Sequence, residues 1–277
     1  MVDGDTDIQL HRAANCPEMI IWKLLYEAGA KQGEMRALSL NDTQLEKIRA
    51  GFDQWPRALQ GIFAAKLAKS LIAADAPDTA AFSLRRSQSA PEQRSGERAM
   101  IAANLANKTE SASAAIKLLA PIVASDSETA PEAAIALTDL ILGQDQNISS
   151  SQKAALDTYR EEYEGTELEE GLIRARLRTA IQENDFAQAI DLMRAYSKLV
   201  RPSKVNLILD EIGQAIVSLT SDASFLKEAV SLPPADFNQI AQPLQDQIGL
   251  RMKELGFSDL AAQLGALRND PAEAVTS

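Results

Sequence analysis

Two arginines one helical turn apart are the residues best placed to do chemistry. Arg174 and Arg178 lie in a segment from about Glu169 to Gln182 that has helical periodicity. A guanidinium group matches the planar geometry of a carboxylate, so this pair could hold a carboxylate-rich or C-terminal peptide. The alternative is a solvated pair, in which Glu170 stabilises Arg174 locally by a few tenths of a kcal/mol. We include Arg194 as a third candidate partner-binding residue.

Nucleophilic and metal chemistry have few residues to draw on. Cys16 is the single cysteine and His11 the single histidine. A lone cysteine cannot form an intramolecular disulfide, and we expect Cys16 to be a small buried residue at a helix start rather than a nucleophile paired with His11. The chain has no G-x-S-x-G, no Gly-rich phosphate loop and no H-E-x-x-H. We therefore expect no catalytic residue, no metal site of the usual His/Cys type and no cofactor.

The charge balance is acidic. Lys and Arg number 28 against 39 Asp and Glu, which gives a net charge of −11 and argues against a nucleic-acid binder. Six glutamates lie between Glu161 and Glu170, without the ligand spacing of a calcium loop, so we expect a solvated helix end and connection. A short basic tract is interpreted as a solvated loop; it contains Arg85, Arg86, Arg94 and Arg98.

No membrane or export signal is visible. The first residues, MVDGDTDIQLHRAANC, are acidic and lack an apolar core, and the apolar stretch Leu118 to Ala124 is too short to cross a bilayer. We expect a soluble, cytoplasmic protein, or a periplasmic one if the true N-terminus is missing.

Helix-forming residues dominate: Ala is roughly a sixth of the chain and Leu roughly an eighth. No stretch combines alternation with β-branched richness, so no strand is expected. A cap residue followed by Pro and an acid predicts helix starts. The matching segments are Asn15–Glu18, Asp75–Asp78, Ser89–Glu92 and Thr129–Glu132, with a capping box at Thr43–Glu46. Breaks are expected at 87–96, 143–151, 201–203 and Pro233-Pro234.

A small residue recurs every 34–40 residues. The positions are Ala80, Ala115, Ala155, Ala189, Ala223 and Ala261. Twelve residues before four of them comes another small residue, whereas Leu177 and Glu211 break this rule. Antiparallel helices approach closely only at small residues, and a single helical hairpin cannot bury its apolar face alone. The spacing therefore predicts an array of helical hairpins, with an irregular helical bundle as the alternative.

Asn184-Asp-Phe-Ala-Gln-Ala-Ile190, with the closing Pro202, resembles the second helix of a tetratricopeptide repeat. Gly256-Phe-Ser-Asp-Leu-Ala261 resembles the same opening, and the alanines around Ala115 give a partial match. Tyr196 departs from the pattern, because a small residue is usual there. The resemblance implies a right-handed α-solenoid whose first helices line a concave face for partners, which is where Arg174 and Arg178 would lie.

The sequence thus predicts an all-α stack of antiparallel hairpins. We expect flexible tails at 1–12 and 269–277, a capping hairpin at 13–54 that Trp22 helps to seal, and tetratricopeptide-like repeats at 55–268. Trp22 and Trp55 are expected to be core or cap-packing residues rather than ligand platforms. The expected function is a non-enzymatic scaffold, adaptor or assembly chaperone that binds a protein or peptide. The alternatives are a self-associating structural subunit and a helical enzyme with paired carboxylates.

Overall fold

The computed structural model describes residues 16–28, 39–87 and 95–266. Within these ranges the chain is entirely helical and no strand occurs, as predicted. The tails expected at 1–12 and 269–277 lie outside the described residues, as does His11. None of the described helices combines the length and the apolar character that crossing a membrane requires.

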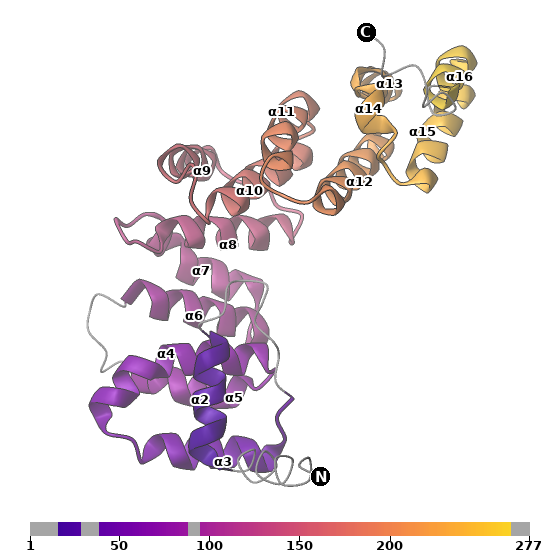
Figure 1. Ribbon diagram of the computed structural model, residues 1–277. Helices are drawn as coiled ribbons and strands as arrows, with labels where there is room; N and C mark the ends of the chain where they lie inside the picture. Colours follow the sequence, from indigo (N-terminus) through magenta and orange to yellow (C-terminus); the bar gives the residue numbers. More distant parts are fainter. Residues whose placement is uncertain (1–15, 29–38, 88–94, 267–277) are drawn as a thin grey trace, which may run out of the picture. The chain divides into compact units, whose positions relative to one another are not determined.

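The helices fall into two compact units, residues 1–140 and 141–277 (Figure 1). The helices of the first unit are α2 (Pro17–Ala28), α3 (Asp42–Asp53), α4 (Arg57–Ala73), α5 (Pro77–Arg86), α6 (Ser95–Thr109), α7 (Ala112–Val123) and α8 (Ala130–Leu142), whose last residues pass the boundary. Those of the second are α9 (Ser150–Glu162), α10 (Glu169–Gln182), α11 (Phe186–Ser197), α12 (Pro202–Ser218), α13 (Asp222–Ser231), α14 (Pro234–Phe237), α15 (Gln242–Glu254) and α16 (Ser258–Ala266).

The predicted helix starts are correct to within a few residues, but two predicted caps are wrong. Helix α3 is capped by Asn41, which forms a capping box with Gln44 in place of the expected Thr43–Glu46. Helix α5 begins at Pro77 with no side-chain cap, because Asp75 belongs to the preceding turn and has a left-handed backbone, with φ 56°. Helix α8 begins directly after Thr129, as expected. The predicted start at 89–92 lies outside the described residues.

The predicted breaks at 143–151 and at Pro233-Pro234 are confirmed, since α8 ends at Leu142 and α13 ends at Ser231. The break expected at 201–203 lies a few residues too late. Helix α11 already ends at Ser197, and Pro202 is the first residue of α12. Proline suits this position because its missing N–H is one that a helix leaves unpaired at its start.

One type of turn recurs at the ends of helices. In each case a backbone N–H after the turn donates to a carbonyl five residues earlier, at 2.9–3.2 Å. The donor and acceptor pairs are Ala76–Leu71, Ser111–Ala106, Gln146–Ile141, Asp185–Ala180 and Phe257–Met252. The residue before the donor has positive φ in four of them, namely Asp75, Asp145, Asn184 and Gly256. This hydrogen bond satisfies a carbonyl at the helix end, as in a Schellman motif, and begins the antiparallel return.

The recurring small residues lie in the second helices, and most are buried at helix contacts. Ala80, Ala115, Ala189 and Ala261 are 0–7% exposed. The helix pairs α4–α5, α6–α7, α10–α11 and α15–α16 that contain them pack together. Ala223 departs from the prediction, because it is exposed at the start of α13.

Helix α12 carries a small buried residue, but two positions away from the expected one. Glu211 is exposed on α12, whereas Gly213 is buried there. A Cβ atom added at Gly213 would lie 3.0 Å from Cγ2 of Ile240. Gly213 therefore allows α12 to approach Ile240 and Leu244 closely, a different contact from the one with α13 that the repeat pattern assigned to position 211.

Alternate helices pack as well as successive ones. Within the first unit α2 contacts α4 and α4 contacts α6; within the second, α10 contacts α12 and α12 contacts α15. Polar contacts recur at about the same separation in sequence, such as Lys108 with Asp75 and Arg86 with Asp53, each 33 residues apart. These two contacts therefore join neighbouring helical hairpins of the first unit.

Helices α2 and α3, inside the predicted capping hairpin, pack together with an aromatic cluster at their edge. Trp55 contacts Phe52 and Trp22, with ring centroids 5.3 and 5.4 Å apart, and is partly buried. Trp22 is 51% exposed, so it is not a core residue, but its ring contacts with Trp55 and Phe63 agree with the cap-packing alternative. The buried face of α2 is already filled by Ile20, Ile21, Leu24 and Leu25.

Two matched substitutions test whether small residues are needed at the helix contacts. We expect Ala189→Leu to lower the free energy of unfolding by about 1–3 kcal/mol, because extra volume cannot be placed between α10 and α11 without displacing helices. Ala223→Leu, on the exposed start of α13, should change it little. Urea titration followed by circular dichroism measures both. Equal effects of the two substitutions would contradict the close-contact role of Ala189.

The left-handed turn gives a second test. Asn184 has φ 59°, so Asn184→Ala should destabilise the chain by about 1 kcal/mol, whereas Asn184→Gly should be neutral or stabilising. Asn206→Ala, at an exposed position within α12, is the control and should not destabilise. A loss of stability with glycine at position 184 would show that the turn does not depend on the left-handed conformation.

Candidate partner-binding surface

Helix α10 displays the predicted arginine pair on one side. Most of its residues are buried against α9, α11 and α12. Glu170, Arg174 and Arg178 are spaced i, i+4, i+8 and remain partly exposed. Helical periodicity alone places these three side chains on a common stripe.

The stripe on α10 makes ionic contacts with α12, which lies about one repeat later in the sequence. Lys204 donates to Oε1 of Glu170, and Nε of Arg178 lies 3.5 Å from Oε2 of Glu211. Sequence reasoning missed both α12 residues as members of the site. The signal that could have found them is the repeat spacing, since each lies about one repeat after its partner.

Tyr196 connects α11 to the same stripe, which explains its departure from the repeat pattern. The side chain is buried, and its hydroxyl donates a long hydrogen bond of 3.5 Å to Glu170. Burial, and then the Glu170 carboxylate, raise the pKa of Tyr196 above its usual value. The hydroxyl, which is protonated at neutral pH even at its ordinary pKa, therefore stays a donor to a more alkaline pH than a free tyrosine.

The contact between Arg178 and Glu211 is weak enough to be exchanged. The two side chains are 36% and 46% exposed. Pairs this open to solvent contribute about 0–1 kcal/mol. A carboxylate from another molecule could therefore replace Glu211 at small cost.

Arg194 occupies a different setting from the α10 pair. It lies on α11, its side chain is 60% exposed, and Nη1 is 3.2 Å from Oδ1 of Asp191 one turn earlier. Its predicted partner-binding role stays a prediction.

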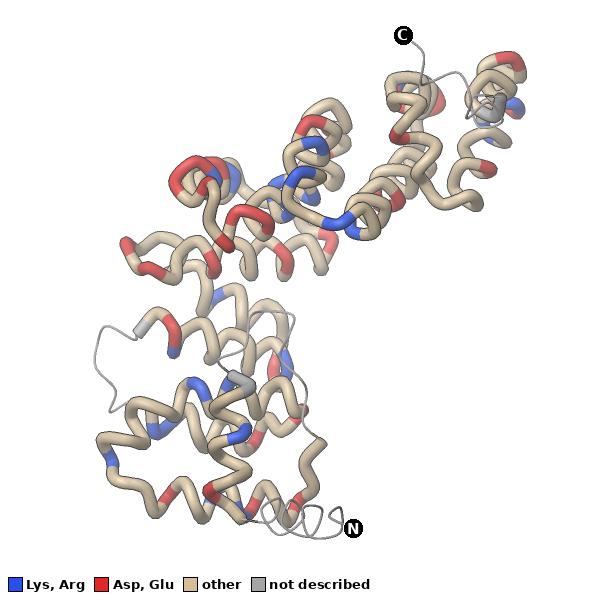
Figure 2. Tube along the Cα trace, in the orientation of Figure 1, with Lys and Arg blue, Asp and Glu red and all other residues tan. Residues whose placement is uncertain are grey.

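The acidic run predicted as a helix end and connection has that structure. Helix α9 ends at Glu162 and α10 begins at Glu169, and red marks the acidic residues around this connection in Figure 2. The intervening residues are largely exposed. Glu169 accepts a hydrogen bond from the backbone N–H of Gly165 at 2.8 Å. In the described parts of the chain, no group of three or more His, Cys, Asp or Glu side chains could hold a metal ion.

Three of the four arginines of the basic tract lie in helices, so the interpretation as a loop is wrong for Arg85, Arg86 and Arg98. Arg85 and Arg86 lie in the last turn of α5, and Arg86 stacks on Phe82 and pairs with Asp53. Arg98 lies in α6 and donates to the carbonyl of Ser87. Arg94 lies outside the described residues. Cys16 is only partly buried, and its Sγ donates to Glu18 at the start of α2.

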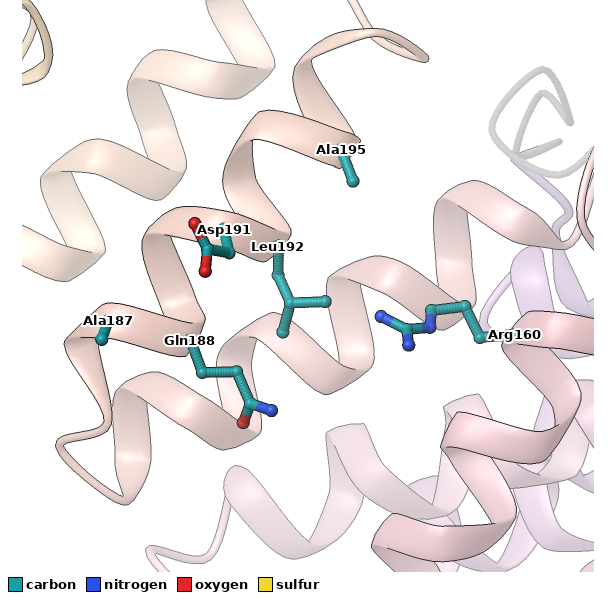
Figure 3. Close-up of a pocket in the computed structure, with 6 residues that line it drawn as sticks. All are labelled: Arg160, Ala187, Gln188, Asp191, Leu192 and Ala195. Carbon is teal, nitrogen blue, oxygen red and sulfur yellow. The ribbon is translucent and has the colours of Figure 1, made fainter.

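A shallow hollow of about 390 Å³ lies between helices α9 and α11. Arg160 reaches into it from α9, and the other lining residues come from α11 (Figure 3). They are Ala187, Gln188, Asp191, Leu192 and Ala195. The lining holds one carboxylate, whereas glycoside hydrolysis of the usual kind needs two.

Arg176 on α10 was not singled out from the sequence, and its environment differs from that of its neighbours. Its side chain is 9% exposed, and Nε lies 3.2 Å from Oδ1 of Asp157 on α9. One of its two terminal nitrogens, Nη1, is buried without a hydrogen-bond partner. The guanidinium is thus held inside the second unit, which indicates a structural role.

No protein-family model matches this sequence, and no curated protein or solved structure matches it significantly.

We expect substitutions at the two members of the Arg176–Asp157 ion pair to change the free energy of unfolding unequally. Asp157→Ala should lower the free energy of unfolding by about 1–3 kcal/mol, because it leaves a buried charge without its acceptor. Arg176→Met, which removes the charge and keeps the volume, should stay within about 1 kcal/mol of wild type. Asp191→Ala breaks the exposed pair with Arg194 and serves as the control, with little change expected. If Asp157→Ala were as mild as Asp191→Ala, Arg176 would not depend on Asp157.

Proposed function

We propose that the chain is a tetratricopeptide-like α-solenoid, a right-handed stack of helical hairpins in each unit. Three regularities support this proposal: the repeated turn, the packing of alternate helices, and the polar contacts about one repeat apart. Stacked hairpins of this kind bury their apolar faces against neighbours, which leaves the exposed side of the first helices for recognition.

We infer that the protein is a non-enzymatic scaffold that binds a protein or peptide partner. The observation that carries this function is the stripe of Arg174 and Arg178 on the otherwise buried helix α10. A helix with nearly all of its surface packed presents these guanidinium groups from a rigid support. Rigid support lowers the entropy that is lost on binding.

The chemistry of the stripe favours carboxylate groups in the partner. Arg174, Arg178 and Lys204 contribute three positive charges, against two from Glu170 and Glu211. Guanidinium groups hold carboxylates in bidentate geometry, and the exposed Arg178–Glu211 contact can be exchanged for one. A peptide with closely spaced acidic residues, or a free C-terminus, fits this arrangement.

The test compares capture of partners from the native source by the wild type and by the Arg174→Ala/Arg178→Ala double variant. We expect at least tenfold lower recovery of the specific partner with the double variant, because two carboxylate contacts are lost. Circular dichroism must show the same helicity in both.

Two single variants complete this comparison. Arg160→Ala, in the hollow between α9 and α11, is the matched arginine control and should retain the partner. Arg194→Ala tests separately the role predicted for that residue. Equal recovery by the wild type and the double variant would remove Arg174 and Arg178 from the binding site. Turnover activity without any reproducible partner would overturn the scaffold function.

A further inference from the structure

Helix α2 is apolar on both faces. Ile20, Ile21, Leu24 and Leu25 form its buried face. On the opposite side Met19, Trp22 and Tyr26 are 52%, 51% and 81% exposed, at positions i, i+3 and i+7. A surface helix of a globular protein normally carries polar residues there, so this face indicates a further contact.

The exposed apolar face continues onto the neighbouring helix α4. The ring of Trp22 contacts that of Phe63, with centroids 5.7 Å apart. Leu59, one turn before Phe63, is 41% exposed, and Ile62 is 37% exposed. We call Met19, Trp22, Tyr26, Leu59 and Ile62 the α2–α4 face.

The charge of α4, which forms one side of this face, has the opposite sign to that of the chain. Helix α4 contains Arg57, Lys66 and Lys69 and no acidic residue, although the chain has a net charge of −11 (Figure 2). Lys66 is exposed one turn after Ile62, and Lys23 is exposed on α2. Burial raises the pKa of Glu132 on α8, and the positive charge of Lys69 partly opposes that shift. Glu18, in the first turn of α2, is an acidic residue at the edge of the face.

We propose that the α2–α4 face binds an amphipathic helix of a partner protein whose apolar side is flanked by Asp and Glu. The stripe from Met19 to Tyr26 extends about 10 Å along α2, which matches two turns of a partner helix with apolar residues at i, i+3 and i+7. The cations of α4 would face the acidic flank, which favours association and sets its orientation.

Charge complementarity favours this occupant over a second copy of the chain. In a symmetric dimer a surface patch meets itself. Two copies of α4 would then bring six positive side chains close together with no acidic residue on either helix. The proposal concerns the first unit alone and does not depend on the arginines of α10.

The natural probe is intrinsic fluorescence, because the chain has two tryptophans and both belong to the aromatic cluster at this face. The full chain is titrated with a synthetic helical peptide that has Leu on one side and Glu on both flanks. A matched peptide has Lys in place of every Glu. We expect a saturable blue shift of the emission with the acidic peptide, and affinity at least tenfold lower for the Lys peptide.

Matched variants assign the binding to this face. Lys66→Glu should weaken the acidic peptide at least tenfold, and Leu59→Ala about fivefold. The controls are Lys117→Glu and Leu118→Ala on α7, where Leu118 is also 41% exposed. Both controls should bind within twofold of wild type.

Four results would overturn the proposal. Equal affinity for the two peptides would mean that charge does not select the partner. Equal losses in the α4 and α7 variants would place the binding elsewhere. No saturable shift with either peptide would exclude an acidic helix. Emission that changes on dilution, together with a dimer in sedimentation velocity that Leu59→Ala dissociates, would assign the face to a second copy.

Discussion

The closest approach of two antiparallel helices governs how each hairpin forms. Ala68 and Ala80 are fully buried where α4 meets α5, and Ala103 and Ala115 are nearly so where α6 meets α7. A larger side chain at these points would separate the helices and open space that the interior could not fill. The repeated turn, with its hydrogen bond to a carbonyl five residues earlier, reverses the chain within a few residues and brings the small residues together. Each hairpin then retains apolar surface that only a neighbouring hairpin can cover.

The exposed helical faces differ in chemistry, although the packed faces are similar. Helices α10 and α12 present paired charges, among them Arg178 with Glu211, whereas α2 and α4 present apolar side chains beside lysines. Packing restricts the inner residues to apolar side chains of suitable volume, but it sets few limits on the outer ones. The proposed recognition therefore rests on these exposed faces, since a helical stack as such is compatible with many functions.

The aromatic content and the charge of parts of the chain differ from the whole-chain averages. Aromatic residues are 5% of the chain, yet Trp22, Phe52, Trp55 and Phe63 meet in one cluster of the first unit. The chain is acidic, yet α4 is purely basic. Overall acidity keeps a protein soluble through mutual repulsion, whereas the local reversal of sign beside exposed aromatic side chains is the basis of the proposed α2–α4 docking face.

The sequence by itself determined what depends on neighbours along the chain. Periodicity identified the helices and placed Arg174 and Arg178 on one stripe, and the small-residue spacing located the contacts at Ala80, Ala115, Ala189 and Ala261. Only the tertiary structure decided which similar residues differ in role. Ala223 and Glu211 are both exposed, whereas Gly213 is buried against Ile240, because burial depends on what packs against a residue. Likewise Lys204 and Glu211 join the arginine stripe across the space between two helices, and the half-exposed Trp22 lies on a face that α2 does not need for its own packing. Helical period is a property of the backbone, but the partner of a side chain is set by segments that are remote in sequence.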